Sequence, residues 1–161
     1  MAMNGFASGT LEKQGQIKGG CDRDGHKDEI EVYKLDHKVT IPTHGQTGAA
    51  TSSRVHDVLV FTMNFDKSLP SLFQALASGE KMKDFTIKFF RIKGGVEEFY
   101  FSIKLENAVV VGIREYKPIT LDAAFTHYED LADVSLRYQK ITWDHVADKT
   151  TAVDDWKAAS K

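Results

Sequence analysis

Residues 58–80 read VLVFTMNFDKSLPSLFQALASGE, and the spacing of the apolar residues changes halfway along this stretch. The first part, 58–65, is largely apolar, which is typical of a strand. After Asp66-Lys67-Ser68 the apolar residues recur at positions i, i+3, i+4 and i+7, the spacing of an amphipathic helix. These helical residues are Leu69, Leu72, Phe73 and Leu76. The stretch therefore predicts a strand that leads directly into a helix.

Three residues predict where this helix begins and ends. Ser68 can accept backbone N–H groups as an N-cap, and Pro70 suits the first turn, where its missing N–H is not needed. Gly79 stands where a left-handed residue ends a helix. Because a helix of about ten residues is marginal alone in water, we expect its apolar face to be buried against a sheet. Each fully buried side chain of that face would contribute about 1.5–3 kcal/mol.

The segment that follows predicts a β-hairpin. Residues 85–92 (FTIKFFRI) and 96–105 (VEEFYFSIKL) are both strand-like, and the Lys93-Gly94-Gly95 turn between them supplies two glycines that accept positive φ. Side chains on a strand point alternately to its two faces. We expect shared faces for Phe85, Ile87 and Phe89 on the first strand, and for Phe99, Phe101, Ile103 and Leu105 on the second.

Two more stretches have the alternation of strands. Residues 28–41 (DEIEVYKLDHKVTI) predict one long half-buried strand, or two strands with a bend near Asp36-His37. A later run alternates apolar and polar residues and ends in Ile141-Thr142-Trp143, so it predicts a further strand. The apolar positions of that run are Val134, Leu136 and Tyr138.

The remaining C-terminal segments have weaker patterns. Residues 119–130 fit either a short helical turn or an irregular connection, and the tail from 144 to 161 is mostly polar. Several antiparallel strands and one helix predict a mainly β fold. We expect an antiparallel β-barrel, formed by two packed sheets, with one α-helix on its side. The length of the chain suits a single domain over residues 1–161.

Residues 40–56 (TIPTHGQTGAATSSRVH) form a long internal segment rich in Thr, Ser, Gly and Ala. Between Pro42 and Arg54 there is almost no large apolar residue, so the segment cannot bury much surface against its own domain. Loops of this length are uncommon in compact domains and are usually functional or disordered. The sequence leaves two alternatives open: the loop extends into solvent, or it becomes ordered against another molecule.

Three aromatic residues fall on strand faces that point away from the predicted core. They are Tyr33, Phe90 and Tyr100, each next to an inward-facing neighbour. Outward aromatic side chains on strands indicate a second layer that covers them. That layer is either the helix or another subunit, and we expect a contribution from both.

Composition narrows the classes of function. The chain of 161 residues has a net charge of -2, with acidic and basic residues interspersed, which argues against a nucleic-acid binder. Cys21 is the only cysteine, so no internal disulfide can form. The N-terminus lacks the basic and apolar regions of a signal peptide, and no run is long enough to predict membrane insertion. We therefore expect the protein to fold in the cytoplasm.

No constellation of residues predicts catalysis, a metal site or a cofactor. The six histidines show no metal-binding spacing, and we expect them on the surface or in turns. The Asp22-x-Asp24-Gly25 spacing hints at a calcium loop, but the later ligands are missing, so residues 21–27 read as a solvated turn. Glu97 and Glu98 are adjacent on a strand and point to opposite faces, so they cannot act on one substrate together.

Five ordered motifs of the chain resemble the Hcp (haemolysin-coregulated protein) family. One of these motifs is FTMNFDKSLPSLFQALASGE at 61–80. The others are QIKG at 16–19, DGHKDEIEVYKLDHKVTIPT at 24–43, FYFSIKLENAVV at 99–110 and HYEDLADVSLRYQKITW at 127–143. The chain departs from the family pattern at Asp144-His145, where relatives usually have Thr-Tyr. Because the motifs lie in order over most of the chain, the resemblance is specific.

This resemblance implies a structural subunit of the type VI secretion system in bacteria. Family members form hexameric rings of β-barrels that stack into a hollow tube, which a contractile sheath ejects from the cell. The implied partners are further copies of the chain, the spike, sheath and baseplate proteins, and effector proteins carried in the lumen. It implies export without a signal peptide. The 40–56 loop would dock onto the neighbouring ring through Ile41, Pro42, Thr43, His44, Gly45, Gln46, Thr47 and Arg54.

Two other classes of protein compete with this interpretation. A small monomeric β-barrel that binds a ligand in its interior would share the same pattern of strands. An enzyme is the third class, and the empty search for catalytic residues disfavours it. The mass of the particle in solution separates the first two, because a ring has the mass of several subunits.

Overall fold

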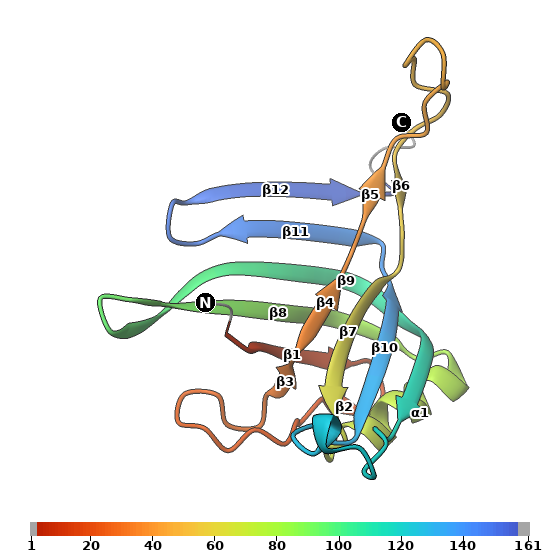
Figure 1. The fold of residues 1–161 in the computed structure, drawn as a ribbon. Coiled ribbons are helices and arrows are strands. Elements are labelled where there is room, and N and C mark those ends of the chain that lie inside the picture. Colours follow the sequence, from red (N-terminus) through yellow and green to blue (C-terminus); the bar gives the residue numbers. More distant parts are fainter. Residues whose placement is uncertain (1–2, 158–161) are drawn as a thin grey trace.

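The longest strand, β9 (Val96–Tyr116), connects the two halves of a curled antiparallel sheet in this computed structural model, which describes residues 3–157 (Figure 1). Its first part pairs with β8 (Lys81–Lys93) and β11 (Lys140–His145), and its last part pairs with β10 (Leu131–Arg137). The remaining elements are β1 (Gly5–Leu11), β2 (Gly15–Gln16), β3 (Ile30–Val32), β4 (Lys34–Asp36), β5 (Val39–Thr40), β6 (Val55–His56), β7 (Leu59–Asn64), α1 (Leu69–Ser78), the 3-10 turn η1 (Ala123–Phe125) and β12 (Thr150–Asp155).

One ten-stranded sheet forms the barrel. Seven of its strands follow the order β2-β1-β8-β9-β10-β7-β4, while β3, β11 and β12 pair outside this path, and every pair is antiparallel. Strand β3 pairs with β1, while β4 pairs with β7, and only Tyr33 separates β3 from β4. The segment 30–36 therefore joins the two ends of the sheet and closes it. This confirms the predicted mainly β, antiparallel barrel with one helix.

Irregular residues bend β9 where it passes from one half of the barrel to the other. The register with β10 shifts between Ser135 and Leu136, so Val111 is an extra residue in β9. Asn107 has a positive φ of 51° within the same strand. A bulge increases the bend and twist of a strand. In Figure 1 the strand accordingly turns from the direction of β8 and β11 to that of β10 and β7.

The core lies between the two halves of the curled sheet. Phe61 on β7 stacks on Phe85 of β8, with 5.4 Å between the ring centroids. Ile30, Leu105 and Leu136 come from three further strands and are completely buried around them. The apolar faces predicted for the strands therefore meet in a single cluster, which is the hydrophobic driving force for curling the sheet.

Helix α1 packs against β9 and covers one side of the barrel. Leu69 and Leu72 are buried, Phe73 and Leu76 pack against the core while partly exposed, and Ala75 is a further buried residue of the same face. Gly79 ends the helix with a φ of 68°.

Ser68 is the N-cap residue of α1, as predicted, but the capping hydrogen bond expected of its side chain is absent. Its side chain makes no capping hydrogen bond to the helix; instead the Ser68 hydroxyl donates to Asp66 Oδ1, which also accepts from the Ser68 backbone N–H at 2.8 Å. Asp66 therefore organises the turn into the helix, because its short carboxylate can bond to the backbone two residues later.

The predicted hairpin is formed by β8 and β9, with Gly94 and Gly95 at φ 60° and 79° in the turn. Its faces differ from the prediction, because the register shifts between Phe89 and Phe90. Phe89 pairs with Phe101 and Phe90 pairs with Phe99, so Phe99 and Phe101 lie on opposite faces. A bulge of this kind reverses the alternation and leaves no trace in the pattern of apolar residues.

The loop at residues 21–27 is a turn whose residues 22–25 and 27 are exposed, as its charges predicted, but two of its residues are buried. His26 is only 6% exposed and stacks on Phe6 with 3.7 Å between ring centroids, and Cys21 is buried as well. Phe6 is an outward-facing residue of β1, so the loop is the layer that covers its ring. Burial raises the pKa of the Cys21 thiol.

The C-terminal tail contains a strand that the sequence did not indicate. Residues 150–155 form β12, which pairs with β11 along its whole length from Lys140↔Asp155 to His145↔Thr150. The apolar pattern missed this strand because it is held by backbone hydrogen bonds, while Val153 remains 56% exposed. The ambiguous segment 119–130 contains the short helical turn η1.

Candidate interaction surfaces

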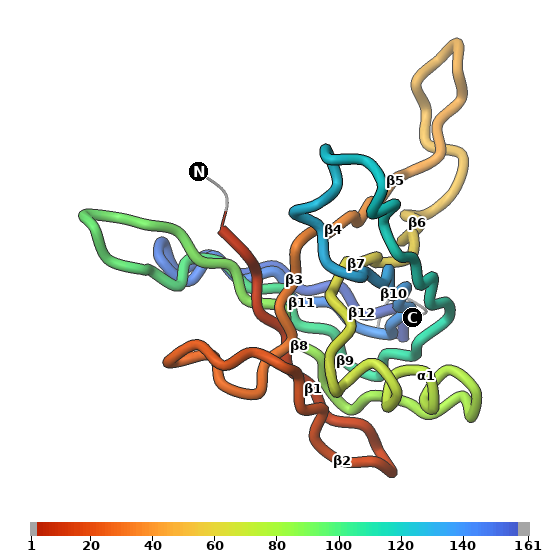
Figure 2. The backbone as a smooth tube through the Cα atoms, turned by 60° about the horizontal axis from the view of Figure 1, so that its bottom comes forward, coloured from red at the N-terminus to blue at the C-terminus, as the bar shows by residue number. Residues whose placement is uncertain are grey.

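Residues 41–54 form a projecting hairpin, the name used below for this segment. Strands β5 and β6 pair at its base, Thr43 bridges Ala50 further out, and the His44 N–H donates to the Ala49 carbonyl at 2.8 Å. Figures 1 and 2 show the hairpin extending away from the barrel. The segment is therefore paired with itself, and its side chains are exposed for contact with solvent or with another molecule.

The outer part of this hairpin presents small polar side chains. Every residue from 41 to 53 is exposed, and Ile41 is 55% exposed. Seven of the eight residues expected to dock on another ring lie in this exposed part: Ile41, Pro42, Thr43, His44, Gly45, Gln46 and Thr47. Arg54, the eighth, lies at the base. The sequence placed it in the same set, but the structure gives it a different environment.

Arg54 is held by Asp154 of the C-terminal strand β12. Arg54 Nε donates to Asp154 Oδ2 at 2.7 Å, and Nη2 donates to Oδ1, so the pair is bidentate. His56 Nε2 lies 2.7 Å from the same Oδ2. The Arg54 guanidinium, and then the hydrogen bond from His56, lower the pKa of the Asp154 carboxyl to about 2.

A chain of hydrogen bonds continues from His56 into the barrel. His56, which is 2% exposed, places Nδ1 2.7 Å from the hydroxyl of Tyr138. His37 Nε2 lies 2.6 Å from the same hydroxyl. Burial raises the pKa of Tyr138, while burial and then His56 lower the pKa of His37. The prediction that the histidines lie on the surface or in turns is therefore wrong for His56, which is buried on β6; His26 does lie in the turn at 21–27, although its side chain is buried.

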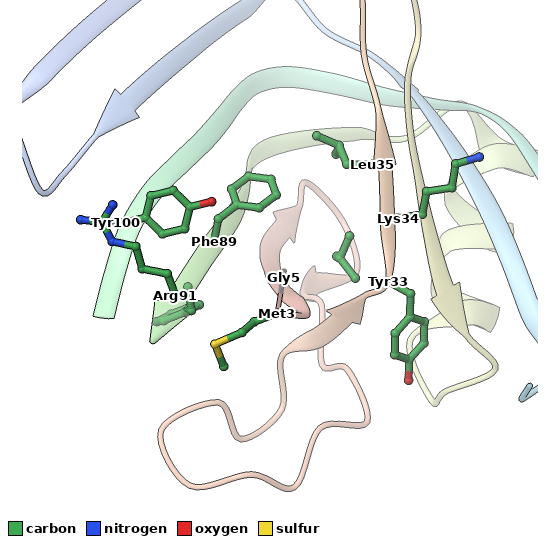
Figure 3. A pocket seen from close by; sticks show the side chains of 10 residues that line it. Met3, Gly5, Tyr33, Lys34, Leu35, Phe89, Arg91 and Tyr100 are labelled. Atoms are coloured by element: carbon green, nitrogen blue, oxygen red, sulfur yellow. The ribbon is translucent and has the colours of Figure 1, made fainter. Parts of the chain in front are cut away.

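The three outward aromatic residues, Tyr33, Phe90 and Tyr100, line one depression of about 210 Å³ (Figure 3). Figure 3 places Tyr33 beside β4, across from Arg91 and Tyr100 on the β8–β9 hairpin. The Arg91 guanidinium lies 5.0 Å from the Tyr100 ring centroid. Burial, followed by the carboxylates of Glu31 and Glu129, raises the pKa of Tyr33.

Within this chain, Phe90 is covered by the loop at 21–27 and by Phe6 of β1. The Phe90 ring meets the edges of His26 and Phe6, at 4.6 and 5.6 Å between centroids. The loop at 21–27 therefore covers part of this ring. A sequence pattern could not show the contact, because these residues are far apart along the chain.

A second depression of about 310 Å³ lies beside the first and was not predicted. It is lined by Tyr33, His127, Tyr128, Glu129 and Leu131. Nearby along the chain, Leu121 is 95% exposed and Phe125 is 41% exposed. Apolar side chains gathered on a surface indicate contact with another molecule. The sequence does contain a sign of this surface, because Leu121 and Phe125 are large apolar residues in a segment without the spacing of a strand.

Within residues 3–157, no group of three or more His, Cys, Asp or Glu side chains is arranged to hold a metal ion. Over the same range, none of the helical structure is long and apolar enough to span a membrane. Glu97 and Glu98 form separate ion pairs: Glu98 with Arg91 at 2.7 Å, and Glu97 with Arg23 at 3.6 Å.

Comparison with known proteins identifies relatives along nearly the whole chain. The family model described as "Type VI secretion system effector, Hcp" matches residues 9–145. The "Major exported protein" of Pseudomonas aeruginosa (strain PAO1) is 36% identical over 168 residues, which cover 98% of each chain.

Two solved structures also share the fold. One described as the crystal structure of an Hcp protein has 32% sequence identity and a TM-score of 0.90, covering 95% of this chain and 97% of its own. The secreted protein Hcp3 of Pseudomonas aeruginosa has 33% identity and a TM-score of 0.80, covering 96% and 99%. With the family model spanning both the barrel and the projecting hairpin, the chain belongs to the Hcp family of type VI secretion system effectors.

Proposed function

We propose that this protein is a structural subunit of the type VI secretion inner tube. In this proposal residues 1–161 act as one tube domain, six copies close into a ring, and rings stack into a hollow tube that a sheath ejects. The observation that carries it is the projecting hairpin, whose residues 41–53 are all exposed while its base is tied to the barrel. A segment of this kind has its contact surface outside its own subunit.

The aromatic depression supplies a second surface, for contact within a ring. Tyr33 and Tyr100 line it together with the partly covered Phe90. A closed ring needs two different complementary patches on each subunit, because its contacts are heterologous. The small polar side chains of the hairpin suit the contact between rings, since a modest interface with few apolar anchors can assemble and come apart.

The proposal also covers partners and location. The subunit would assemble in the cytoplasm, meet the spike, sheath and baseplate proteins there, and carry effectors in its lumen through export without a signal peptide. It would act through assembly alone, without cofactor or catalysis. The alternative of a ligand-binding barrel is disfavoured, because side chains such as Phe61 and Leu105 fill the interior and are completely buried.

Deleting Gln46–Ser52 tests the role of the hairpin. We expect the shortened chain to form rings near six times 18.0 kDa by light scattering, because the deletion lies outside the barrel. Electron micrographs should show rings without tubes, while the intact chain forms both. Long tubes from the shortened chain would contradict the stacking role. A full-length chain that remains monomeric at high concentration would instead favour the ligand-binding barrel.

A further inference from the structure

The projecting hairpin joins the barrel through two short junctions. Strands β5 and β6 form a two-stranded sheet of their own, separate from the ten-stranded sheet. Residues 37–38 connect β4 to β5, and residues 57–58 connect β6 to β7. The Asp57 N–H donates to the Lys38 carbonyl at 3.0 Å between these junctions. Because a two-stranded ribbon is marginally stable and can pivot, its direction depends on side chains that cross the junctions.

We propose that five side chains form a clamp that fixes the direction of this hairpin relative to the barrel. The hairpin clamp consists of Arg54, Asp154, His56, Tyr138 and His37. The inference rests on the proposed role of the hairpin in ring stacking, and it assigns these residues a positioning function within that role.

The carboxylate of Asp154 makes the contact between β12 and the base of the hairpin. It receives two hydrogen bonds from Arg54 and a further one from His56, and these two residues flank Val55 where the chain returns to the barrel. Bidentate Arg–carboxylate pairs restrict both distance and orientation. The side chains of Arg54 and Asp154 are 31% and 23% exposed, so bulk water screens the pair only in part. Strand β12 thereby holds β6 at a defined angle.

The hydrogen bonds that link His56, Tyr138 and His37 can all point in one direction along the chain of side chains. Tyr138 has one hydroxyl proton and faces a ring nitrogen of His56 at 2.7 Å and one of His37 at 2.6 Å. With His56 Nε2–H donating to Asp154, its Nδ1 accepts from the Tyr138 hydroxyl. The hydroxyl oxygen then accepts from His37 Nε2–H. In this order the Tyr138 hydroxyl donates one hydrogen bond and accepts another.

Packing keeps the central imidazole in place. The ring of Trp143 lies nearly parallel to His56 at 6.3 Å between centroids, and Trp156 lies 5.2 Å away. Arg137 adds a contact to the backbone carbonyl of His56 at 3.5 Å. Since His56 has so little freedom, movement of β12 is transmitted to the hairpin, and the C-terminal strand sets where the stacking surface points.

The test measures the direction of the hairpin by pulsed electron spin resonance. Spin labels are attached through Gln46→Cys on the hairpin and Lys83→Cys on the exposed side of β8, in a Cys21→Ser background, and labelled chains are diluted with unlabelled ones. With the clamp intact, we expect one narrow distance distribution. In Asp154→Ala the distribution should become about twofold broader, because the ribbon pivots at its junctions.

Further variants distinguish a loss of hairpin positioning from a general loss of stability. Arg54→Gln should broaden the distribution as well, and because Arg54 lies on the hairpin side it leaves the barrel core untouched. Asp154→Glu, which keeps the carboxylate, should restore most of the narrow distribution. The matched control is Glu98→Ala, which breaks the Arg91–Glu98 ion pair, also 2.7 Å from Nε to a carboxylate oxygen but in another hairpin. It should leave the distribution unchanged.

The outcomes distinguish the clamp from the stacking role. An unchanged width in both Asp154→Ala and Arg54→Gln would overturn the clamp, as would equal broadening in Glu98→Ala. A broader distribution with loss of tubes, while ring mass and melting temperature are kept, supports both inferences. A broader distribution in variants that still form long tubes would support the clamp and contradict the stacking role.

Discussion

The barrel and the projecting hairpin are built from the same antiparallel pairing, but different forces hold them. In the barrel, apolar faces meet: Leu72, Phe85 and Leu136 are completely buried. In the hairpin, residues 41–53 are all exposed, so backbone hydrogen bonds are its main internal support. Burial provides most of the stabilising free energy of a folded chain. Substitutions should therefore alter stability in the barrel and assembly in the hairpin.

The largest expected effect is in the helix that covers the barrel. Leu72→Asp places an unpaired carboxylate at a position that is 0% exposed, so it should lower the free energy of unfolding by more than about 4 kcal/mol. Thermal denaturation followed by circular dichroism measures the loss. The control Gln74→Asp adds the same charge on the exposed side of the helix and should change stability by less than about 0.5 kcal/mol. Equal melting temperatures for both variants would show that the helix does not depend on its buried face.

Gly19 and Gly45 differ in the room that the structure leaves for a side chain, so alanine substitutions at the two positions compare the barrel with the hairpin. A Cβ atom at Gly19 would lie 2.2 Å from the backbone carbonyl oxygen of Glu29, whereas one at Gly45 meets nothing within 4 Å. Gly19→Ala should cost about 1–3 kcal/mol, because backbone must move to admit the methyl group. Gly45→Ala should stay within about 0.5 kcal/mol. Urea denaturation of the two variants measures both values, and a larger loss at Gly45 would reverse the comparison.

The third comparison concerns the contact that joins the two regions. The pKa of Asp154 is about 2 in the folded chain and about 3.9 in an unfolded one, so its depressed value stabilises the fold at neutral pH. This contribution is present above about pH 4 and is lost as the pH falls toward about 2. Carboxyl-carbon NMR should follow the titration, and Arg54→Ala should raise the pKa. Titration of Asp154 near its ordinary value in the intact chain would contradict the bidentate pair.

Much of the barrel could be predicted because its signals are local. The spacing of Leu69 and Leu72 indicated the helix, and Gly94-Gly95 indicated the turn between β8 and β9. The position of Gly79 also predicted the end of the helix. These features follow from backbone geometry and from the alternation of buried and exposed side chains within a few residues. Family motifs in the same order along the chain then predicted the family that the comparisons show.

Some of the errors lie where distant segments meet, and another lies within the β8–β9 hairpin. The sequence places His26 in a turn, and only the structure shows that its ring stacks on Phe6. The sequence likewise gives no sign that His56 is buried next to Asp154 of β12. The register shift at Phe89 and Phe90 reversed a face that simple alternation had assigned. Each of these contacts joins residues with no shared local pattern.

By itself, the sequence determined which residues are apolar, where turns occur and which family the motifs resemble, because each of these depends on neighbours in the chain. Only the tertiary structure decided that the 40–56 loop pairs with itself and that Arg54 is bound to Asp154, 100 residues further along. Such contacts arise after the sheet has curled and brought its edges together. The physical reason is that hydrophobic burial acts without direction, whereas the ion pair requires one particular geometry.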